Sequence, residues 1–444
     1  MLSRDLAEFA CGLRFEDLPP EVVNACRTAV TDWLGSVVAG SREEPAVMVA
    51  SVVRHAGGTP RATMIGFNEK SSALNAALVN GTSCHILELD DLHRSSILHP
   101  AAPIISAAVA VAEDREVGGR DLITAVVAGY ETGIRIAEAV TPSHYHYWHT
   151  TATCGTFGAA VAAASVISLD VEGIINALGN AGSQAAGLWE FLRDGAMTKH
   201  LHPGKAAMNG LLSVLLAEQG FTGAEQILEG NKGFFKATAG EYFPERVIDG
   251  LQCDYRILGN SYKIYPSCRH THSAVDLALE LVSGGLNPAG VDQIVIKTYR
   301  HAQDLVGGPD YETPYRAKFS LPYCVAAAMV DEKLDLHSFD FSRPPDPLVA
   351  ELASRCRVVI DPELEKLYPA NWSAIIEVKM KDGRVVEGRT DYPRGDPENP
   401  ASDDLIRDKF RQLATLVWSS DKVTRTLELL KSLEQLDRIE HLFD

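Results

Sequence analysis

Apolar positions recur at helical spacing through the first part of the chain. Pro20 precedes an amphipathic stretch at 21–39, and Asp121 opens another at 121–140. Four more segments are rich in alanine and leucine, with small residues that allow close helix packing: 101–113, 156–169, 171–191 and 205–219. We therefore expect a helical domain over residues 1–262.

The pattern changes after about residue 260. Residues 291–299 are rich in β-branched side chains and predict a strand. Residues 374–380 and 384–390 alternate on either side of Asp382-Gly383, a dipeptide typical of a two-residue hairpin. Helical patterns lie around these strands, at 273–284 and 319–333. This part of the chain predicts a smaller α+β domain.

A polar, proline-rich connection at 391–402 leads to two final helical stretches, 403–416 and 420–440. We expect these helices to pack back on the helical domain. The predicted fold class is therefore mainly α: a large all-helical domain, 1–262 completed by 403–444, and an α+β lid domain at 263–402.

Composition narrows the class of protein. The 444 residues carry a net charge of −18, which argues against nucleic acid or an anionic membrane as the main partner. The eight cysteines include no C-x-x-C pair, so they indicate reduced core residues and no zinc ribbon. The first residues carry acids and no long apolar run, and no later run is long enough to span a bilayer. We expect a cytoplasmic protein.

Ten of the fourteen histidines fall in four short windows: 85–99, 144–149, 200–202 and 270–272. Each window adjoins charged residues and runs into an apolar helical stretch. Histidine has the side-chain pKa nearest neutrality, so it is the usual proton carrier at physiological pH. We expect these helix entrances to form one composite site.

The first two windows combine acids, histidines and threonines. Asp90 and His93 lie three residues apart, so a helical turn would pair a carboxylate with an imidazole. His99 precedes Pro100 at a predicted helix start. A capping loop with a surface salt bridge is the alternative for this window. In the second window His149 lies nearest its helix, and an aromatic interface loop is the alternative there.

The third window, TKHLHPGK at 198–205, resembles a phosphate loop only superficially, because Ala206 replaces the required Ser or Thr. We therefore reject nucleotide binding. Lys205 would stand in the first turn of an apolar helix, where a lysine opposes the helix dipole. A bound anion would offset both charges, so this conflict favours a carboxylate site.

The fourth window ends in a variant capping box formed by Ser273 and Asp276. His272 would then lie just outside a helix N-terminus, beside Arg269, and the free amides of that terminus suit a carboxylate. A metal site is the alternative, because His270 and His272 would share one face of a strand. The capping box weakens that alternative.

Five ordered segments resemble the MmgE/PrpD family: LELDDLH…HP (87–100), HTTATCGTFGAA (149–160), KHLHPGKAAMNG (199–210), YPSCRHTHSAVD (265–276) and FSLPYCVA (319–326). That family includes 2-methylcitrate dehydratase, cis-aconitate decarboxylase and iminodisuccinate epimerase, and the resemblance covers nearly the whole chain. It implies a cofactor-independent homodimer with a large helical domain, an α+β lid and an active site between them. We accordingly expect no cofactor and no metal.

Carried over position by position, the resemblance implies these catalytic positions: Asp90, Asp91, His99, Lys205 and His272. Around them we expect substrate contacts from His93, His149, Lys199, Ser267 and Arg269. Two departures from the family pattern lie in this region, Glu88 where many members have aspartate and Leu92 where many have threonine. The family's best-known substrates therefore do not transfer directly.

The reactions of this family create or discharge carbanion character next to a carboxylate. We expect His272 or His99 to move the carbon-bound proton and Lys205 to bind a substrate carboxylate. The Asp90/Asp91 pair would orient an imidazole or assist a departing hydroxyl. The predicted function is a lyase that dehydrates a small, anionic di- or tricarboxylate, as 2-methylcitrate dehydratase does.

Three alternatives stay open at this point. Epimerisation, isomerisation or decarboxylation of a related acid is the alternative within the family. A non-catalytic carboxylate-binding protein is the second. The third is a metal-dependent hydrolase that uses Asp90, His93, His270 and His272.

Overall fold

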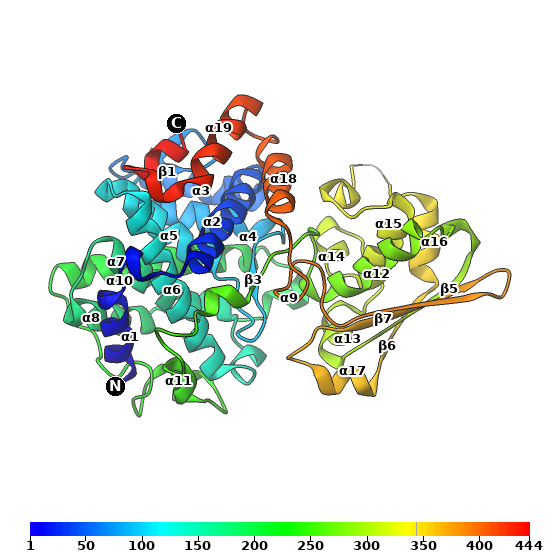
Figure 1. The fold of residues 1–444 in the computed structure, drawn as a ribbon, viewed down its shortest axis with the longest axis horizontal. Coiled ribbons are helices and arrows are strands. Elements are labelled where there is room, and N and C mark those ends of the chain that lie inside the picture. The colour runs from blue at the N-terminus through cyan, green and yellow to red at the C-terminus, as the bar shows by residue number, and fades with distance from the viewer. Residues whose placement is uncertain (343) are drawn as a thin grey trace. The chain divides into compact units, whose positions relative to one another are not determined.

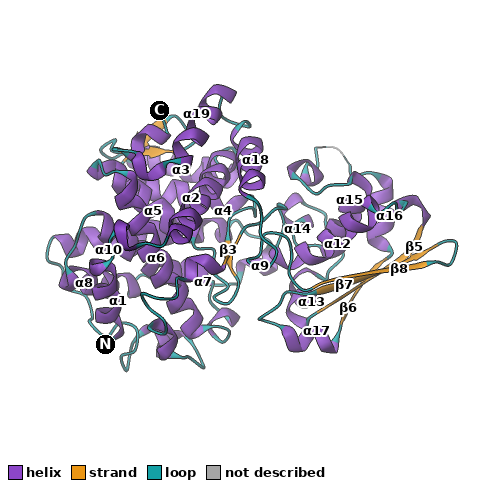
Figure 2. Ribbon diagram, in the orientation of Figure 1, coloured by secondary structure: helices purple, strands orange, loops and turns teal. Residues whose placement is uncertain are grey.

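The computed structural model describes residues 1–342 and 344–444. The chain divides into two compact units, one made of Met1–Tyr262 with Ser402–Asp444 and the other of Lys263–Ala401. Figure 1 traces the elements of both units, and Figure 2 shows that the long strands all belong to the second. Within the two described ranges, no helix is both long and apolar enough to cross a membrane.

The first unit is almost entirely helical. Its helices are α1 (Leu2–Gly12), α2 (Pro20–Gly40), α3 (Glu44–Ala56), α4 (Ala73–Ile86), α5 (Ala101–Arg115), α6 (Gly119–Val140), α7 (Thr150–Val166), α8 (Val171–Gly182), α9 (Phe191–Asp194), α10 (Thr198–Glu218), α11 (Phe234–Thr238), α18 (Asp403–Ala414) and α19 (Ser420–Lys431). Two short antiparallel pairs add β1 (Ala62–Met64) with β2 (Glu69–Ser71), and β3 (Leu92–His93) with β4 (Asn260–Ser261).

The core of this unit is made by helices that are buried on every face. Every residue of α5 from Ala101 to Glu113 is buried, and so is every residue of α7 from Thr150 to Ala164. Such helices need no polar stripe, which explains their alanine-rich, nearly uncharged sequences. Small residues also let α6 and α7 approach closely, since a Cβ on Gly129 would come within 2.8 Å of the Gly158 carbonyl oxygen.

A glycine contact between α4 and α10 positions two histidines of the candidate site. A Cβ on Gly81 would lie 2.8 Å from the Cα of Gly204, and one on Gly204 would lie 2.3 Å from the carbonyl oxygen of Leu78. Only glycine permits this backbone approach. His85 follows Gly81 by one helical turn and His202 precedes Gly204 by two residues, so the contact brings both imidazoles to one region.

The second unit is an α+β structure around a four-stranded sheet. Its strands are β5 (Val291–Thr298), β6 (Cys356–Ile360), β7 (Ala374–Met380) and β8 (Val385–Thr390), in the order β6-β5-β7-β8. β5 and β6 run parallel and the other neighbours antiparallel. Its helices are α12 (His272–Ser283), α13 (Arg300–Val306), α14 (Pro314–Ala317), α15 (Leu321–Asp331), α16 (Pro347–Ser354) and α17 (Pro362–Leu367). α12 packs on β7 and β8.

The predicted fold class, mainly helical with a smaller α+β part, is confirmed, but several element boundaries were wrong. The helix predicted at 171–191 ends at Gly182. The helix predicted at 420–440 ends at Lys431 and is followed by two separate 3₁₀ turns. The helix predicted at 205–219 begins seven residues earlier, at Thr198. Pro203 lies inside it, because a proline near a helix start loses only one backbone hydrogen bond and tight packing keeps the helix continuous.

Candidate active site

The acidic motif folds as a buried loop between α4 and α5. Its Asp90 lies beside His85, the penultimate residue of α4, with Nδ1 of His85 2.7 Å from Oδ2 of Asp90 and both side chains fully buried. The same carboxylate oxygen lies 3.4 Å from Nδ1 of His99. One aspartate therefore contacts two imidazoles, whose ring centroids are 4.8 Å apart.

His99 has one nitrogen fixed by the backbone of the same loop. Its Nδ1 lies 2.6 Å from the carbonyl oxygen of Asp91, which can only accept, so Nδ1 carries a proton. In the neutral ring the lone pair is then on Nε2. The backbone amide of His99 donates to Oγ1 of Thr151 on α7 at 3.1 Å, and the side chain keeps 13% of its exposure. His99 is thus oriented as a base.

Asp91 connects three elements around this loop. It accepts hydrogen bonds from the amide of Ala101 at 3.0 Å, the hydroxyl of Tyr130 at 2.7 Å and the side-chain amide of Asn260 at 2.8 Å. These donors belong to α5, α6 and β4. Burial raises the pKa of Asp91 to about 7. The carboxyl group therefore holds the loop in place from within.

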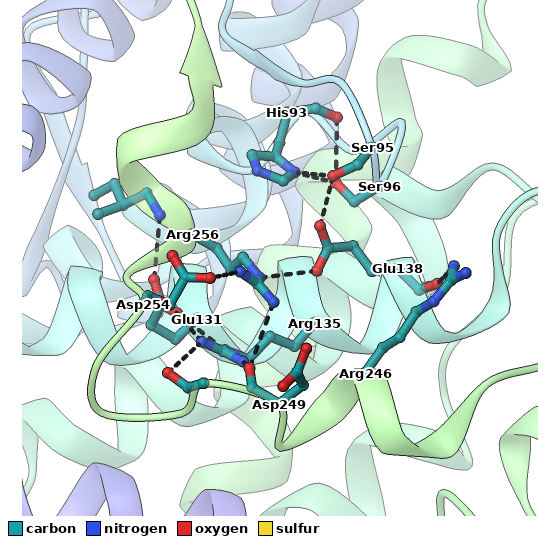
Figure 3. Close-up of polar contacts among 12 residues, drawn as sticks. His93, Ser95, Ser96, Glu131, Arg135, Glu138, Arg246, Asp249, Asp254 and Arg256 are labelled. Carbon is teal, nitrogen blue, oxygen red and sulfur yellow. Dashed lines mark hydrogen bonds and ion pairs between the residues drawn. The ribbon is translucent and has the colours of Figure 1, made fainter. Parts of the chain in front are cut away.

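The three-residue spacing predicted that His93 pairs with Asp90, and this prediction was wrong. The motif forms a strand at His93 and not a helical turn. His93 belongs to β3, and its Nδ1 lies 3.0 Å from Oγ of Ser96. Figure 3 shows this imidazole in a polar network with Ser95 and Glu138. The Ser95 hydroxyl donates to Glu138 at 2.5 Å. Burial lowers the pKa of His93 to about 4, so the ring is neutral near pH 7.

The same network continues through arginines of α6 and the segment before β4. Nε of Arg256 donates to Glu138 at 3.1 Å (Figure 3). The fully buried Arg135 donates to Glu131 at 3.0 Å and to the carbonyl oxygen of Asp254 at 2.6 Å. This network fixes one side of the acidic loop to α6. The charged and polar groups of this network hydrogen-bond to one another, so we interpret its role as positioning the loop.

His149 forms a second imidazole group with a residue of α10. It is the N-cap residue of α7, and its Nδ1 lies 3.1 Å from Nδ1 of His202, so one of the two rings donates to the other. Trp189 and Phe191 lie against His149, with centroid distances of 4.8 and 6.3 Å. Burial lowers the pKa of His149 well below its usual range and that of His202 to about 4. His85 lies 5.7 Å from His149 and connects this pair to Asp90.

The two lysines of α10 have different environments. Lys199 is buried in an ion pair with Glu88, the residue that departs from the family pattern. Lys205 is the eighth residue of α10, two turns beyond the position predicted for it, so the argument from an unfavourable helix dipole was wrong. Lys205 is half-buried, and no hydrogen-bond or ion-pair partner contacts it in the part of the chain that the structure describes.

In the second unit, Arg269 holds His272. The buried guanidinium of Arg269 forms an ion pair with Asp396 and donates to the carbonyl oxygen of Arg394 at 3.1 Å. Its Nη1 also lies 2.9 Å from Nδ1 of His272. An arginine can only donate, so Nδ1 of His272 accepts and the proton of the neutral ring is on Nε2. His272 is therefore oriented as a donor.

The predicted capping box at this helix is absent. His272 is the first residue of α12, with Thr271 as its N-cap, so it does not lie outside the helix. The Ser273 hydroxyl donates to the carbonyl oxygen of Trp372, and Asp276 accepts from the Tyr265 hydroxyl at 2.6 Å. Tertiary partners replaced the local cap, which sequence spacing alone does not reveal.

Within its own unit, neither half of the predicted metal set of Asp90, His93, His270 and His272 has the expected geometry, because Asp90 does not pair with His93 and His270 does not lie on a strand. His270 lies in a 3₁₀ turn and not on a strand, stacked 4.1 Å from Trp372 and 2.6 Å from the hydroxyl of Tyr299. Its neighbour Ser267 is buried and lies 2.8 Å from Oγ1 of Thr271. A different trio, His85, Asp90 and His99, has ligand atoms within 4.8 Å of one another. Its His99 Nδ1 already donates to a carbonyl oxygen, which disfavours metal binding through that atom.

The structure thus gathers Asp90, Asp91 and His99 in one loop. The ring of His85 lies between Asp90 of this loop and His149. Two members of this group, His85 and His202, were not among the site residues predicted from the sequence. Sequence reasoning also missed Trp189 and Phe191, because an aromatic loop beyond a helix end has no periodicity. The short spacing of His85 to the acidic motif was the one available signal.

Comparison with known families finds matches in both units of the chain. The MmgE/PrpD N-terminal domain matches residues 4–246, and the MmgE/PrpD C-terminal domain matches residues 265–435. The chain therefore belongs to the MmgE/PrpD family.

Its curated relatives are similar along nearly their whole length. A cis-aconitate decarboxylase-like protein, oryM, of Aspergillus oryzae is 27% identical over 98% of this chain and 94% of its own. The cis-aconitate decarboxylase of Aspergillus terreus is 26% identical over 100% and 95%. The human cis-aconitate decarboxylase is 25% identical over 96% and 90%.

Proposed function

We propose that this protein is a lyase that acts on a small di- or tricarboxylate by moving a proton at the carbon next to a carboxylate. One observation carries the proposal: the Asp91 carbonyl oxygen and the Asp90 carboxylate both face Nδ1 of His99. This leaves the Nε2 lone pair of the neutral ring as a base. A nearby carboxylate also stabilises the imidazolium that forms when the base takes a proton.

In the dehydration that we put first, Nε2 of His99 removes the carbon-bound proton. The electron pair of that C–H bond becomes the C=C bond as the C–O bond to the hydroxyl breaks. The hydroxyl leaves as water once it is protonated, a step for which we propose His272, the site histidine that the family resemblance implies. Lys205 offers a positive charge to a substrate carboxylate, and a single positioned acid–base group contributes about 100- to 10,000-fold.

Decarboxylation is the second candidate, favoured by the names of the curated relatives, which are cis-aconitate decarboxylases. Here the C–C bond to a carboxylate breaks, CO₂ leaves, and the electron pair left on carbon takes a proton from Nε2 of His272. Decarboxylation needs the proton donor, His272. Dehydration and epimerisation also need the base, His99. The two histidines therefore distinguish the candidate reactions.

The test is product analysis by NMR on a panel of citrate-, aconitate- and amino-dicarboxylate-like acids. His99→Asn keeps a donor near the position of Nδ1 and removes the base. We therefore expect it to lower the rate of dehydration or epimerisation at least 100-fold. A decarboxylase would lose more activity in His272→Ala than in His99→Asn. Near-normal turnover in both variants contradicts the proposal.

Two further measurements separate the remaining alternatives. Activity that survives chelation, in protein found free of metal, argues against the metal-dependent hydrolase. A binding protein would bind these acids without converting any of them. The homodimer that the family resemblance implies is part of this proposal, and light scattering checks it.

A further inference from the structure

The segment between α8 and α10 holds an indole against His149. The amide of His149 donates to the carbonyl oxygen of Gly187 at 3.0 Å, and the amide of Trp189 donates to that of Tyr147 at 3.2 Å. A Cβ on Gly187 would lie 2.3 Å from Cβ of Ala152, so glycine is required for this close approach. The pairing fixes the backbone of Trp189 to the start of α7.

The ring of Trp189 is enclosed by other rings. Its centroid lies 4.8 Å from His149, 5.2 Å from Phe191 and 4.8 Å from Tyr145. Phe191 in turn lies 5.4 Å from His202. These aromatic contacts hold the indole in one orientation, so the direction of its N–H bond is set by the fold.

The N–H group of this indole lacks an acceptor in the described part of the chain. Nε1 of Trp189 is buried, and among the residues that the structure describes none accepts its hydrogen bond. An indole nitrogen can only donate, and leaving such a donor buried and unbonded destabilises the fold. Nε2 of His85 is likewise buried without a partner in the described chain, and its ring lies against the same imidazole, His149. Two unbonded polar atoms thus flank one ring of the candidate site.

We propose that Nε1 of Trp189 donates a hydrogen bond to a carboxylate oxygen of the bound substrate. The inference rests on the proposed function and adds a substrate-binding residue to it. The charge nearby suits an anion, because Lys205 lies three residues after His202 on α10 and its charge contributes to lowering the pKa of that histidine. Trp189 would set the direction of the carboxylate, and Lys205 would supply the charge.

The test compares Trp189→Phe, which keeps an aromatic ring and deletes the donor, with Trp418→Phe as the matched control. Trp418 lies between α18 and α19, in contact with Lys422. We expect KM for the active carboxylate to rise about 10-fold or more in Trp189→Phe, as for the loss of a hydrogen bond to a charged group, with kcat changed less. Trp189→His, which restores a ring N–H, should recover part of the loss, and the control should match the wild type.

Substrate should also quench tryptophan fluorescence in the wild type and in Trp418→Phe, and not in Trp189→Phe. A Trp189→Phe variant with wild-type KM and unaltered quenching overturns the inference while leaving the proposed function intact. A wild-type protein that converts none of the acids overturns the proposed function itself. Circular dichroism confirms that each variant is folded.

Discussion

The buried ion pair of Lys199 and Glu88 gives a prediction that decides what Lys199 does. The side chains are 5% and 2% exposed, so water contributes little to stabilising either charge. Removing one partner of a buried pair leaves an uncompensated charge and costs about 3–5 kcal/mol. We therefore expect Glu88→Gln and Lys199→Met each to lower the free energy of unfolding by about that amount.

The double variant should be much more stable than the sum of the two single losses predicts. Urea denaturation of the wild type, both single variants and the double variant gives the coupling energy directly. Glu363→Gln is the matched control, because its pair with Lys366 is exposed and contributes at most about 1 kcal/mol. Additive losses in the double variant would refute the reasoning.

The same four proteins test the substrate contact expected of Lys199. If Lys199 only positions the acidic loop through Glu88, KM should recover in the double variant together with stability. If KM stays high after stability has recovered, Lys199 contacts the substrate, as predicted from the sequence.

Two further predictions concern the fold around the site. Gly204→Ala should lower the free energy of unfolding by about 1–3 kcal/mol, because its Cβ would lie 2.3 Å from the Leu78 carbonyl oxygen. Gly12→Ala, with open space around its Cβ, should leave the stability unchanged, and thermal melts of both variants check this. Lowering the pH from about 6.5 towards 4 should destabilise the protein. In this range His93 and His202, whose pKa values in the folded protein are about 4, take up a proton only in the unfolded chain. Each histidine contributes about 1.4 kcal/mol per pH unit, and protonation of the folded Asp91, whose pKa is about 7, offsets about one of the two. Stability that rises from pH 7 to pH 5 would contradict the assignment.

Helical periodicity and turn residues were enough to predict the fold class from the sequence. The buried helices α5 and α7 are recognisable from their alanine-rich composition, and the β7–β8 hairpin from Asp382-Gly383. The histidine windows and the acidic motif also marked the segments from which the candidate site is built. His99 and His149 lie at helix starts, as predicted.

The partners of the site residues could not be predicted, because they come from distant segments. Asp396 lies 127 residues from the Arg269 that it pairs with, and Glu88 lies 111 residues from Lys199. His93 was misassigned because a short strand replaced the helical turn that its spacing suggested. Local spacing indicates which residues are available for chemistry, and tertiary packing decides which of them meet.

The most direct test of the account follows the substrate proton in deuterated water. Wild-type protein, incubated with the acid that it converts, should place solvent deuterium on the carbon next to a carboxylate, in recovered substrate or in product, as NMR detects. His99→Asn should lose this exchange at least 100-fold if His99 is the base. Undiminished exchange in His99→Asn would contradict the assignment of His99.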